Sequence, residues 1–538
     1  MNSSWPSLLL YAGCTLIALV TATALYLFRE AFSFLPASYR NLQGPEPDSL
    51  IWGNLQQILS SSPPAAVHTQ WIKRFGPTYS YTSLFCKPEF FSADPTAIAF
   101  MLSHADIFPK PDEHRNNMKD TLGRGLIVAE GHDHKRQRRL LMPGMTNGAV
   151  QGMMAVFFDK SYEMRDVLAR TVGSGREVDM LDCLGKATLD IIGLTGFDYS
   201  FNSLANERTE LGEAYKGLFD VEGTSLAFLQ SLLPILKLIP NERTRIIKNA
   251  KTSSRRIGQA LIDEKRRQIL AVHADGVEKS DVEGKDLLSI MMRANLASDL
   301  RPDQRMSDEE VLAQITSFFV AGNETSSTGL TWILYTLAQN IESQNRLRAE
   351  LLAVPEDRPS MDDLTALPYL DLVVKEVLRL HAPVLNVSRM AGADVEIPLG
   401  TPVRGRNGKM MDSVKLRKGT NCYIPLYIPN TATEIWGADA MLYHPERFGR
   451  PESKNTNLPG VWGNMMTFWG GARGCIGFRF SIIEMKVILF MLIRNFYFEE
   501  APGHPVIAKR NTATTRPIVV GEEDRGFQLP LLVSPVIS

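Results

Sequence analysis

The chain has 538 residues, 44% of them hydrophobic, and its formal net charge is −1 at pH 7. This length allows a large buried core, and the near-neutral charge provides no global basic field that would hold nucleic acid. The five cysteines are widely scattered and form no C-x-x-C pair, which argues against both a disulfide framework and a zinc site.

The stretch from Pro6 to Phe28 contains no charged residue. At about 1.5 Å per residue, a helix of this length crosses a hydrocarbon core about 30 Å thick. A cleaved signal peptide is the alternative, since Ala22-Thr23-Ala24 has small-x-small character, but no Lys or Arg precedes the run and the run exceeds a usual signal core. We therefore expect a transmembrane anchor over residues 1–30. Basic residues follow only after it, which predicts a cytosolic location for the remainder.

The proline-containing residues 31–54 suit a stiff connector, followed by one large domain over 55–538. Two β-leaning runs, Tyr79 to Phe85 and Glu89 to Ser92, predict a hairpin of a small sheet. Beyond them the apolar spacing is mostly helical, and His273 to Gly284 has the composition of a solvated loop. The fold class is therefore mainly α with small β-sheets. The helices expected are Asp133 to Met142, Thr188 to Thr195, Leu226 to Ile239 (broken or kinked at Pro234), Arg243 to Leu270 and Leu287 to Ala294.

A long helix is expected to begin at Ser307, which has capping-box spacing to Glu310. Its apolar pattern continues to Leu337 but is interrupted by Ala321-Gly322-Asn323-Glu324-Thr325-Ser326. Glycine and a buried acid both cost stability inside a helix, and Thr325 is placed to bond the carbonyl four residues earlier. An ordinary polar stripe is the alternative explanation of this segment.

Glu376 and Arg379 lie one turn apart in a helix predicted from Asp371 to Leu380, a spacing that is also common in exposed ion pairs. Farther on, the insertion Leu399 to Lys418 contains Asn407-Gly408, the usual type I′ hairpin turn.

The stretch from Phe468 to Gly477 places Cys475 at a glycine-rich turn before an apolar-periodic run, Phe478 to Phe496. A helix N-terminus lowers a thiol pKa, and Gly471, Gly474 and Gly477 permit positive φ and close backbone approach. A buried structural cysteine is the alternative. The whole string, however, matches F-x-x-G-x-R-x-C-x-G at every fixed position. It resembles the cytochrome P-450 superfamily of cysteine-thiolate haem monooxygenases.

This resemblance implies haem b as the cofactor, with Cys475 as the axial ligand of the iron. Arg473 would contact a haem propionate, Phe468 would pack beside the sulfur, and Gly471 and Gly477 would shape the loop beneath the cofactor.

Further cations toward the propionates are implied at Arg138 and at Arg389. The family usually has W-x-x-x-R where this chain has His134 and Arg138, so histidine stands in for tryptophan. A surface arginine is the alternative at both arginine positions.

The segment around Glu324 resembles the family's A-G-x-[DE]-T oxygen-binding motif, in which small residues make room for dioxygen. Thr325 and Glu324 would then be the catalytic pair that holds water and relays protons. Pro445-Glu446-Arg447-Phe448 matches the family's P-E-R-F, so Glu376, Arg379 and Arg447 are expected to form a structural triad.

Electrons are expected from a separate NADPH–cytochrome P-450 reductase, because no G-x-G-x-x-G follows a strand. The basic run His134 to Arg139 would lie near the docking surface, unless it is only a solvated helix face. The anchor and the resemblance together predict a single-pass protein of the endoplasmic reticulum membrane with a cytosolic catalytic domain.

The function implied is hydroxylation or epoxidation of a lipophilic small molecule with O2. The insertion resembles that of fungal members, which suggests a terpenoid or another secondary metabolite. Two alternatives remain: a haem-thiolate isomerase or dehydratase that needs no external electrons, and a non-catalytic haem-binding protein. Family layout places the substrate near three loops, Phe108 to Leu122, Phe228 to Leu233 and Val384 to Val387.

Overall fold

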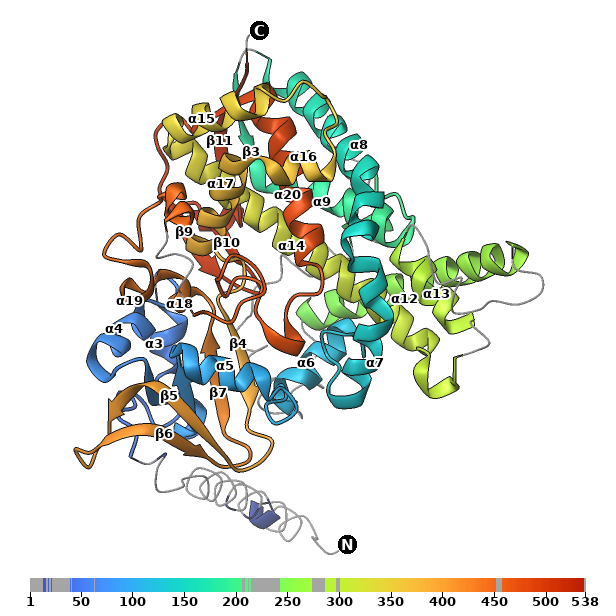
Figure 1. Ribbon diagram of the computed structural model, residues 1–538. Helices are drawn as coiled ribbons and strands as arrows, with labels where there is room; N and C mark the ends of the chain where they lie inside the picture. Colours follow the sequence, from blue (N-terminus) through green and yellow to red (C-terminus); the bar gives the residue numbers. More distant parts are fainter. Residues whose placement is uncertain are drawn as a thin grey trace, which may run out of the picture. The chain divides into compact units, whose positions relative to one another are not determined.

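The computed structural model describes residues 41–450 and 457–536, with gaps at 62, 174, 206–208, 211, 214–241, 273–285 and 297–299, together with residues 13–15, 18, 21 and 39. The chain divides into two compact units (Figure 1). The first unit comprises Met1–Pro109 and Asn386–Pro425, and the second comprises Lys110–Leu385 and Leu426–Ser538.

The first unit carries most of its strands in one four-stranded sheet of order β1-β2-β7-β4. Strands β1 and β2 are antiparallel, β2 and β7 are parallel, and β4 and β7 are antiparallel. The elements of this unit are α3 (Leu55–Leu59), α4 (Ala66–Phe75), β1 (Thr78–Thr82), β2 (Pro88–Ser92), α5 (Pro95–Ser103), β4 (Asn386–Met390), β5 (Val395–Arg404), β6 (Met410–Leu416) and β7 (Asn421–Pro425).

The predicted hairpin of β1 and β2 is present, but β1 ends at Thr82 rather than Phe85. Residues 84–86 form a 3-10 turn in which Phe85 and Cys86 have φ of 54° and 56°. Positive φ is incompatible with an extended strand, so the chain reverses here earlier than its β-leaning composition indicated.

The insertion forms the antiparallel pair of β5 and β6, as predicted, with a different turn. Gly408 has a φ of 80°, but Asn407 is not among the residues with positive φ, which a type I′ turn requires at both central positions. The Gly408 N–H donates to the Gly405 carbonyl at 3.0 Å, and the Gly405 N–H donates to the Lys409 carbonyl at 2.8 Å. The connection is therefore a longer loop with one left-handed glycine.

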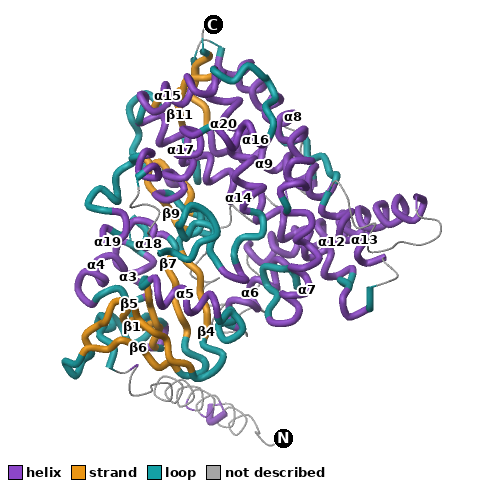
Figure 2. Tube along the Cα trace, viewed as in Figure 1, coloured by secondary structure: helices purple, strands orange, loops and turns teal. Residues whose placement is uncertain are grey.

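The second unit is mainly helical, as Figure 2 shows by colour. Its sheets are small, one of order β3-β11-β8 and one of β10-β9. Its helices are α6 (Asp112–Leu122), α7 (Gly131–Leu141), α8 (Asn147–Val172), α9 (Met180–Phe197), α12 (Glu242–Val272), α13 (Leu287–Leu296), α14 (Asp308–Gln339), α15 (Ile341–Leu352), α16 (Met361–Ala366), α17 (Pro368–Leu380), α18 (Tyr427–Thr431), α19 (Thr433–Trp436) and α20 (Phe478–Asn495). Its strands are β3 (Arg176–Asp179), β8 (Phe496–Glu500), β9 (Ile507–Asn511), β10 (Thr515–Val519) and β11 (Pro530–Pro535).

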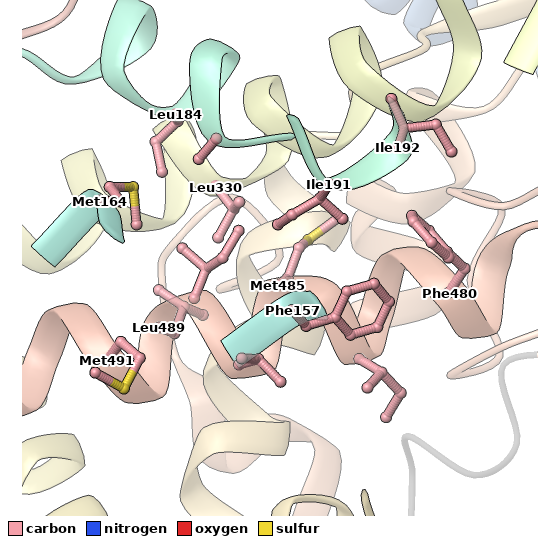
Figure 3. Close-up of a cluster of buried hydrophobic side chains, with 14 of the residues drawn as sticks. Phe157, Met164, Leu184, Ile191, Ile192, Leu330, Phe480, Met485, Leu489 and Met491 are labelled. Carbon is pink, nitrogen blue, oxygen red and sulfur yellow. The ribbon is translucent and has the colours of Figure 1, made fainter. Parts of the chain in front are cut away.

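Four helices, α8, α9, α14 and α20, meet in the core of this unit (Figure 3). Apolar side chains from each of them are fully or almost fully buried, among them Phe157, Ile191, Leu330 and Leu489. Burying a side chain of this size contributes about 1.5–3 kcal/mol, so this core fixes the two helices that carry the expected site, α14 and α20.

The predicted helices within the described residues are confirmed as α7, α9, α12, α13, α14, α17 and α20. Helix α9 begins at Met180, well before the predicted start at Thr188. The Asp179 side chain caps this earlier start by accepting from the Leu181 N–H at 3.1 Å. A capping box of Ser307 and Glu310 starts α14, as predicted.

Several predictions concern residues outside the described ones. These are most of the anchor, most of residues 31–40, the helix Leu226 to Ile239, the loop Phe228 to Leu233 and the whole of His273 to Gly284. None of the helices formed by the described residues has both the length and the apolar character of a membrane span.

Candidate haem-thiolate site

The cysteine loop is closed by main-chain hydrogen bonds. The Cys475 N–H donates to the Phe468 carbonyl at 2.9 Å, and the Gly474 N–H donates to the Gly471 carbonyl at 3.0 Å. Of its four glycines only Gly471 has a positive φ, of 63°. Gly474 is required for space instead, because a Cβ there would meet Val461 Cγ1 at 2.9 Å, whereas Gly477 lies in ordinary backbone geometry before α20.

The Cys475 side chain remains accessible on this loop. The Gly477 N–H and the charge of Arg138 both favour its thiolate, as a helix N-terminus should, but loss of hydration outweighs them and raises the pKa of the thiol. The helix terminus thus favours the thiolate as predicted, but desolvation decides the net direction of the shift. A metal bound to the sulfur would supply the missing positive charge, since coordination deprotonates a thiol outright.

Two predicted cations lie close to the thiol. Burial lowers the pKa of the Arg138 guanidinium, and the neighbouring Arg473 lowers it further, while Cys475 acts in the opposite direction. His134 lies one turn before Arg138 on α7 and is buried. The structure thus brings Cys475, Arg138 and Arg473 together, with His134 on the same helix.

Arg473 has protein partners that the sequence did not indicate. Its Nη1 donates to the Ala129 carbonyl at 2.9 Å, and its Nη2 pairs with the Glu130 carboxylate. Lys110 donates to the same carboxylate at 2.9 Å. Glu130 therefore binds two cations in the segment just before α7, and a haem propionate at Arg473 would share that arginine with a carboxylate of the chain.

Helix α14 runs without a break through the polar segment that interrupts its apolar pattern. The Thr325 hydroxyl donates to the Ala321 carbonyl at 2.6 Å, the back-bond that the sequence predicted. The adjacent Glu324 is buried, and its Oε1 accepts from the Thr514 hydroxyl at 2.7 Å.

Gly322 has a packing role that the motif alone did not indicate. A Cβ at this position would meet Ile192 Cγ1 at 2.8 Å and Cδ1 at 2.9 Å. Ile192 belongs to α9, so the missing side chain allows the backbone of α14 to approach that helix closely.

The expected triad is assembled and fully buried. Arg379 donates from Nε and Nη2 to the two oxygens of Glu376, at 2.8 Å each, and Arg447 Nε lies 3.4 Å from Oε1. The other arginine donors reach main-chain carbonyls, among them those of Asn430 and Trp436, and Arg447 Nη1 also donates to the Asp439 carboxylate at 2.7 Å. A buried pair with this bidentate geometry is strongly orienting.

Asn430 connects the triad to the cysteine loop. Its carbonyl accepts from Arg379 at 2.7 Å, while its side chain accepts from the Met466 N–H at 2.6 Å and donates to Thr467 Oγ1 at 2.9 Å. Met466 and Thr467 immediately precede Phe468, so the triad fixes the start of the loop through one asparagine. No local pattern marks Asn430, because its partners are 36 or more residues away.

Arg389 lies in β4 of the first unit. Its Nη1 donates to the Ser388 carbonyl at 2.8 Å. Of the substrate loops expected from family layout, residues 112–122 are helical, as α6, and β4 begins at Asn386.

The basic run on α7 is divided in its roles. Arg136 is paired with Glu310 and Asp133 inside the unit, whereas Lys135 and Arg139 are exposed. Only part of the run is thus exposed to solvent.

The class of protein follows from how these parts combine. An accessible cysteine held at the start of α20, arginines beside it, and an acid–threonine pair in the long helix α14 are the arrangement of a haem-thiolate protein. Comparison with known proteins gives the family. The sequence profile of cytochrome P450 matches residues 43–521, so the chain belongs to the cytochrome P450 family.

Its relatives are fungal monooxygenases. The chain is 40% identical over 505 residues to cytochrome P450 monooxygenase 205 of Postia placenta, covering 92% of this chain and 93% of the relative. It is 34% identical to cytochrome P450 monooxygenase claQ of Ampulloclitocybe clavipes, with 92% and 93% covered. Ganoderic acid synthetase CYP5150L8 of Ganoderma lucidum is 31% identical, with 90% and 93% covered.

The protein is accordingly a cytochrome P450 monooxygenase with a cysteine-thiolate haem b, and such enzymes use O2, a lipophilic substrate and a redox partner. The residues present fit the cofactor, because the Cys475 thiol stays accessible while Arg138 and Arg473 provide positive charge beside it.

Proposed function

We propose that this monooxygenase hydroxylates or epoxidises a lipophilic small molecule, a terpenoid or another secondary metabolite, with electrons from NADPH–cytochrome P450 reductase. The observation that carries the proposal is the intact pair of Glu324 and Thr325 in α14, in a chain that also has the Cys475 loop. An isomerase or dehydratase has no need of proton delivery to oxygen. The name of the Ganoderma lucidum relative supports the substrate class.

The overall reaction balances as RH + O2 + NADPH + H⁺ giving ROH + NADP⁺ + H2O. Haem bound through a thiolate supplies the activation of dioxygen, because the electron-rich sulfur favours O–O cleavage. The cofactor would be held by Cys475 and, at its propionates, by Arg473, Arg138, His134 and Arg389. Phe468, Gly471 and Gly477 would shape the loop below it.

Proton supply is the task of the chain itself. We assign Thr325 to hold a water molecule and Glu324 to relay protons to that water. The triad of Glu376, Arg379 and Arg447 has a structural role behind the loop.

We further propose that residues 1–30 anchor the protein in the endoplasmic reticulum membrane in a single pass, that residues 31–54 are the hinge, and that residues 55–538 form the cytosolic catalytic domain. The uncharged stretch from Pro6 to Phe28 supports this assignment.

Isotope labelling tests the function. Microsomes with the full-length protein and the reductase are incubated with NADPH, ¹⁸O2 and a panel of terpenoids, and products are identified by mass spectrometry. We expect NADPH-dependent products that carry one ¹⁸O atom. Products formed without NADPH and without label would favour an isomerase or dehydratase, and absence of NADPH-dependent O2 consumption would favour a non-catalytic haem protein.

Two variants test the residue assignments. Cys475→Ala should abolish the strongly red-shifted Soret band of the reduced CO complex, and an unchanged band would remove Cys475 from the ligand role. Thr325→Ala should keep that band but release more hydrogen peroxide per NADPH. Unchanged coupling would reject the role of Thr325.

A further inference from the structure

Glu324 is oriented by a segment far along the chain. Its Oε1 accepts from Thr514 Oγ1 at 2.7 Å and lies 3.6 Å from Arg516 Nε. Thr514 is in the turn between β9 and β10, and Arg516 is in β10. These contacts direct the carboxylate of α14 toward this hairpin.

The hairpin is itself fixed to the helical part of the second unit. Trp332 of α14 donates from Nε1 to the Thr515 carbonyl at 2.7 Å, and the Thr515 N–H donates to the Pro383 carbonyl at 2.8 Å. Thr328, one turn after Glu324, donates to Thr514 Oγ1 at 3.4 Å. Hydrogen bonds with α14 and with Pro383 therefore fix the position of Thr514 relative to Glu324.

Arg516 combines burial with access to water. Its side chain is 12% exposed, and its guanidinium lies 4.2 Å above the Phe527 ring. A cation this close to a largely buried carboxylate favours the charged form of the acid, and low exposure limits screening by salt. Ring stacking holds the guanidinium plane while leaving its edge for the carboxylate.

We propose that Thr514 and Arg516 are positioning residues that keep Glu324 ionised and directed to the β9–β10 turn, where it takes up protons from solvent. Each proton binds to the carboxylate at this turn and then leaves to the water held by Thr325, so Glu324 is unchanged after the transfer. This inference rests on the proposed role of Glu324 and Thr325 in proton supply. The hairpin would thereby set how often a proton reaches oxygen before peroxide escapes.

The link between Arg516 and Glu324 is tested without turnover, by a double-mutant cycle in thermal unfolding of the full-length haem protein. The variants are Arg516→Gln, Glu324→Gln and their combination. We expect Arg516→Gln to lower the midpoint, because it removes a cation that lies 3.6 Å from the acid, and Glu324→Gln to recover about 2 °C or more of that loss in the double variant. Strictly additive shifts would overturn the inference.

The consequence for proton supply is tested with the reductase, NADPH and O2 alone. Release of peroxide consumes one NADPH per O2, whereas reduction to two water molecules consumes two NADPH and needs more protons. Arg516→Gln and Thr514→Val should therefore raise the peroxide formed per NADPH, and Arg516→Lys should restore most of the wild-type ratio because it keeps the charge.

Matched controls are available in the same hairpin. Arg510 is exposed and lies directly opposite Arg516 across the strand pair, and Thr515 is a buried neighbour whose hydroxyl has no hydrogen-bond partner within the described residues. Arg510→Gln and Thr515→Val should leave the ratio at the wild-type value.

The outcomes separate this inference from the function on which it rests. A ratio in Arg516→Gln equal to that of Arg510→Gln, while Thr325→Ala and Glu324→Gln raise peroxide, would overturn only the role of the hairpin. If those two variants also leave the ratio unchanged, the proposed proton supply itself fails and the inference falls with it. Non-additive shifts of the unfolding midpoint, together with a peroxide ratio that rises in Arg516→Gln and returns toward the wild-type value in Arg516→Lys, would support the inference.

Discussion

The Glu484 side chain on α20 is fully buried, and neither of its carboxyl oxygens has a hydrogen-bond partner within the described residues. Burial raises the pKa of this acid to about 8, and the nearby Ser326 hydroxyl offsets only part of the effect. The acid is therefore protonated in the folded protein at a pH where it is ionised in the unfolded chain.

The pH dependence of stability follows from this difference. Between about pH 4.5 and pH 8 the folded state binds one more proton at Glu484 than the unfolded state, so the free energy of unfolding falls as pH rises. Glu484→Gln removes this dependence. We expect its stability relative to wild type to increase by roughly 3–4 kcal/mol between pH 5 and pH 8, as an upper limit from about 1.4 kcal/mol per pH unit.

Urea unfolding of the haem protein at pH 5.5 and pH 8 measures this change, with the exposed Glu499→Gln as the control. Equal pH slopes for wild type and Glu484→Gln would show that Glu484 does not titrate in this range.

At the scale of elements, Gly322 permits one close approach between α14 and α9. Ala at position 322 would gain up to about 1 kcal/mol of helix propensity, but its Cβ would overlap Ile192 at 2.8 Å. Overpacking of this kind costs about 1–3 kcal/mol.

We therefore expect Gly322→Ala to destabilise the protein. Ile192→Ala also destabilises it, by leaving a cavity, and the two changes together should be less harmful than their sum because the new methyl group occupies part of that cavity. Urea unfolding of the three variants checks the non-additivity. Additive losses in the free energy of unfolding would mean that α14 and α9 move apart, so that the new methyl group does not fill the cavity.

The triad links α17 to the segment before the cysteine loop, and its charges are buried. Removing the shared carboxylate leaves the buried Arg379 without a counter-charge, whereas Arg447 keeps its ion pair with Asp439 at 2.7 Å. One uncompensated buried charge typically costs about 3–5 kcal/mol.

Glu376→Gln should accordingly lower the free energy of unfolding by about that amount and reduce the haem content per protein. Absorbance of the reduced CO complex, normalised to protein, measures the haem content. Lys375→Gln on the same helix is a suitable control, because its partner Asp371 also pairs with Lys486. A normal haem content in Glu376→Gln would mean that the loop is held by other contacts.

At the scale of the whole molecule, the proposed membrane attachment has two candidate sources. The uncharged N-terminal stretch is one, and the first unit also exposes apolar side chains, among them Leu50 at 82% and Leu59 at 69%. A span of about 20 apolar residues holds a protein in a bilayer far more strongly than a few exposed side chains.

Deletion of residues 2–30 should thus move most of the protein from the membrane pellet to the supernatant, with the CO spectrum retained. Immunoblots of both fractions measure the distribution. If the shortened protein stays in the pellet, Leu50→Ser and Leu59→Ser in the same background will show whether the first unit is responsible.

The sequence did not indicate helices such as α8 and α15, but it predicted the family, Cys475 as the thiol ligand, and the helices α7, α9, α12, α13, α14, α17 and α20. Each of these depends on residues within one or two turns of each other: the capping box at Ser307, the back-bond of Thr325, and the string from Phe468 to Gly477. Short-range geometry fixes such features, so a pattern of neighbours is enough to predict them.

The side chains that contact the site residues could be identified only from the tertiary structure. Glu324 meets Thr514, 190 positions away, and Arg473 meets Glu130, 343 positions away. The raised pKa of the Cys475 thiol reflects the hydration lost to the surrounding chain, and the space at Gly322 belongs to Ile192. Packing and desolvation depend on residues that are distant in the chain. The sequence pattern around each site residue therefore could not predict them.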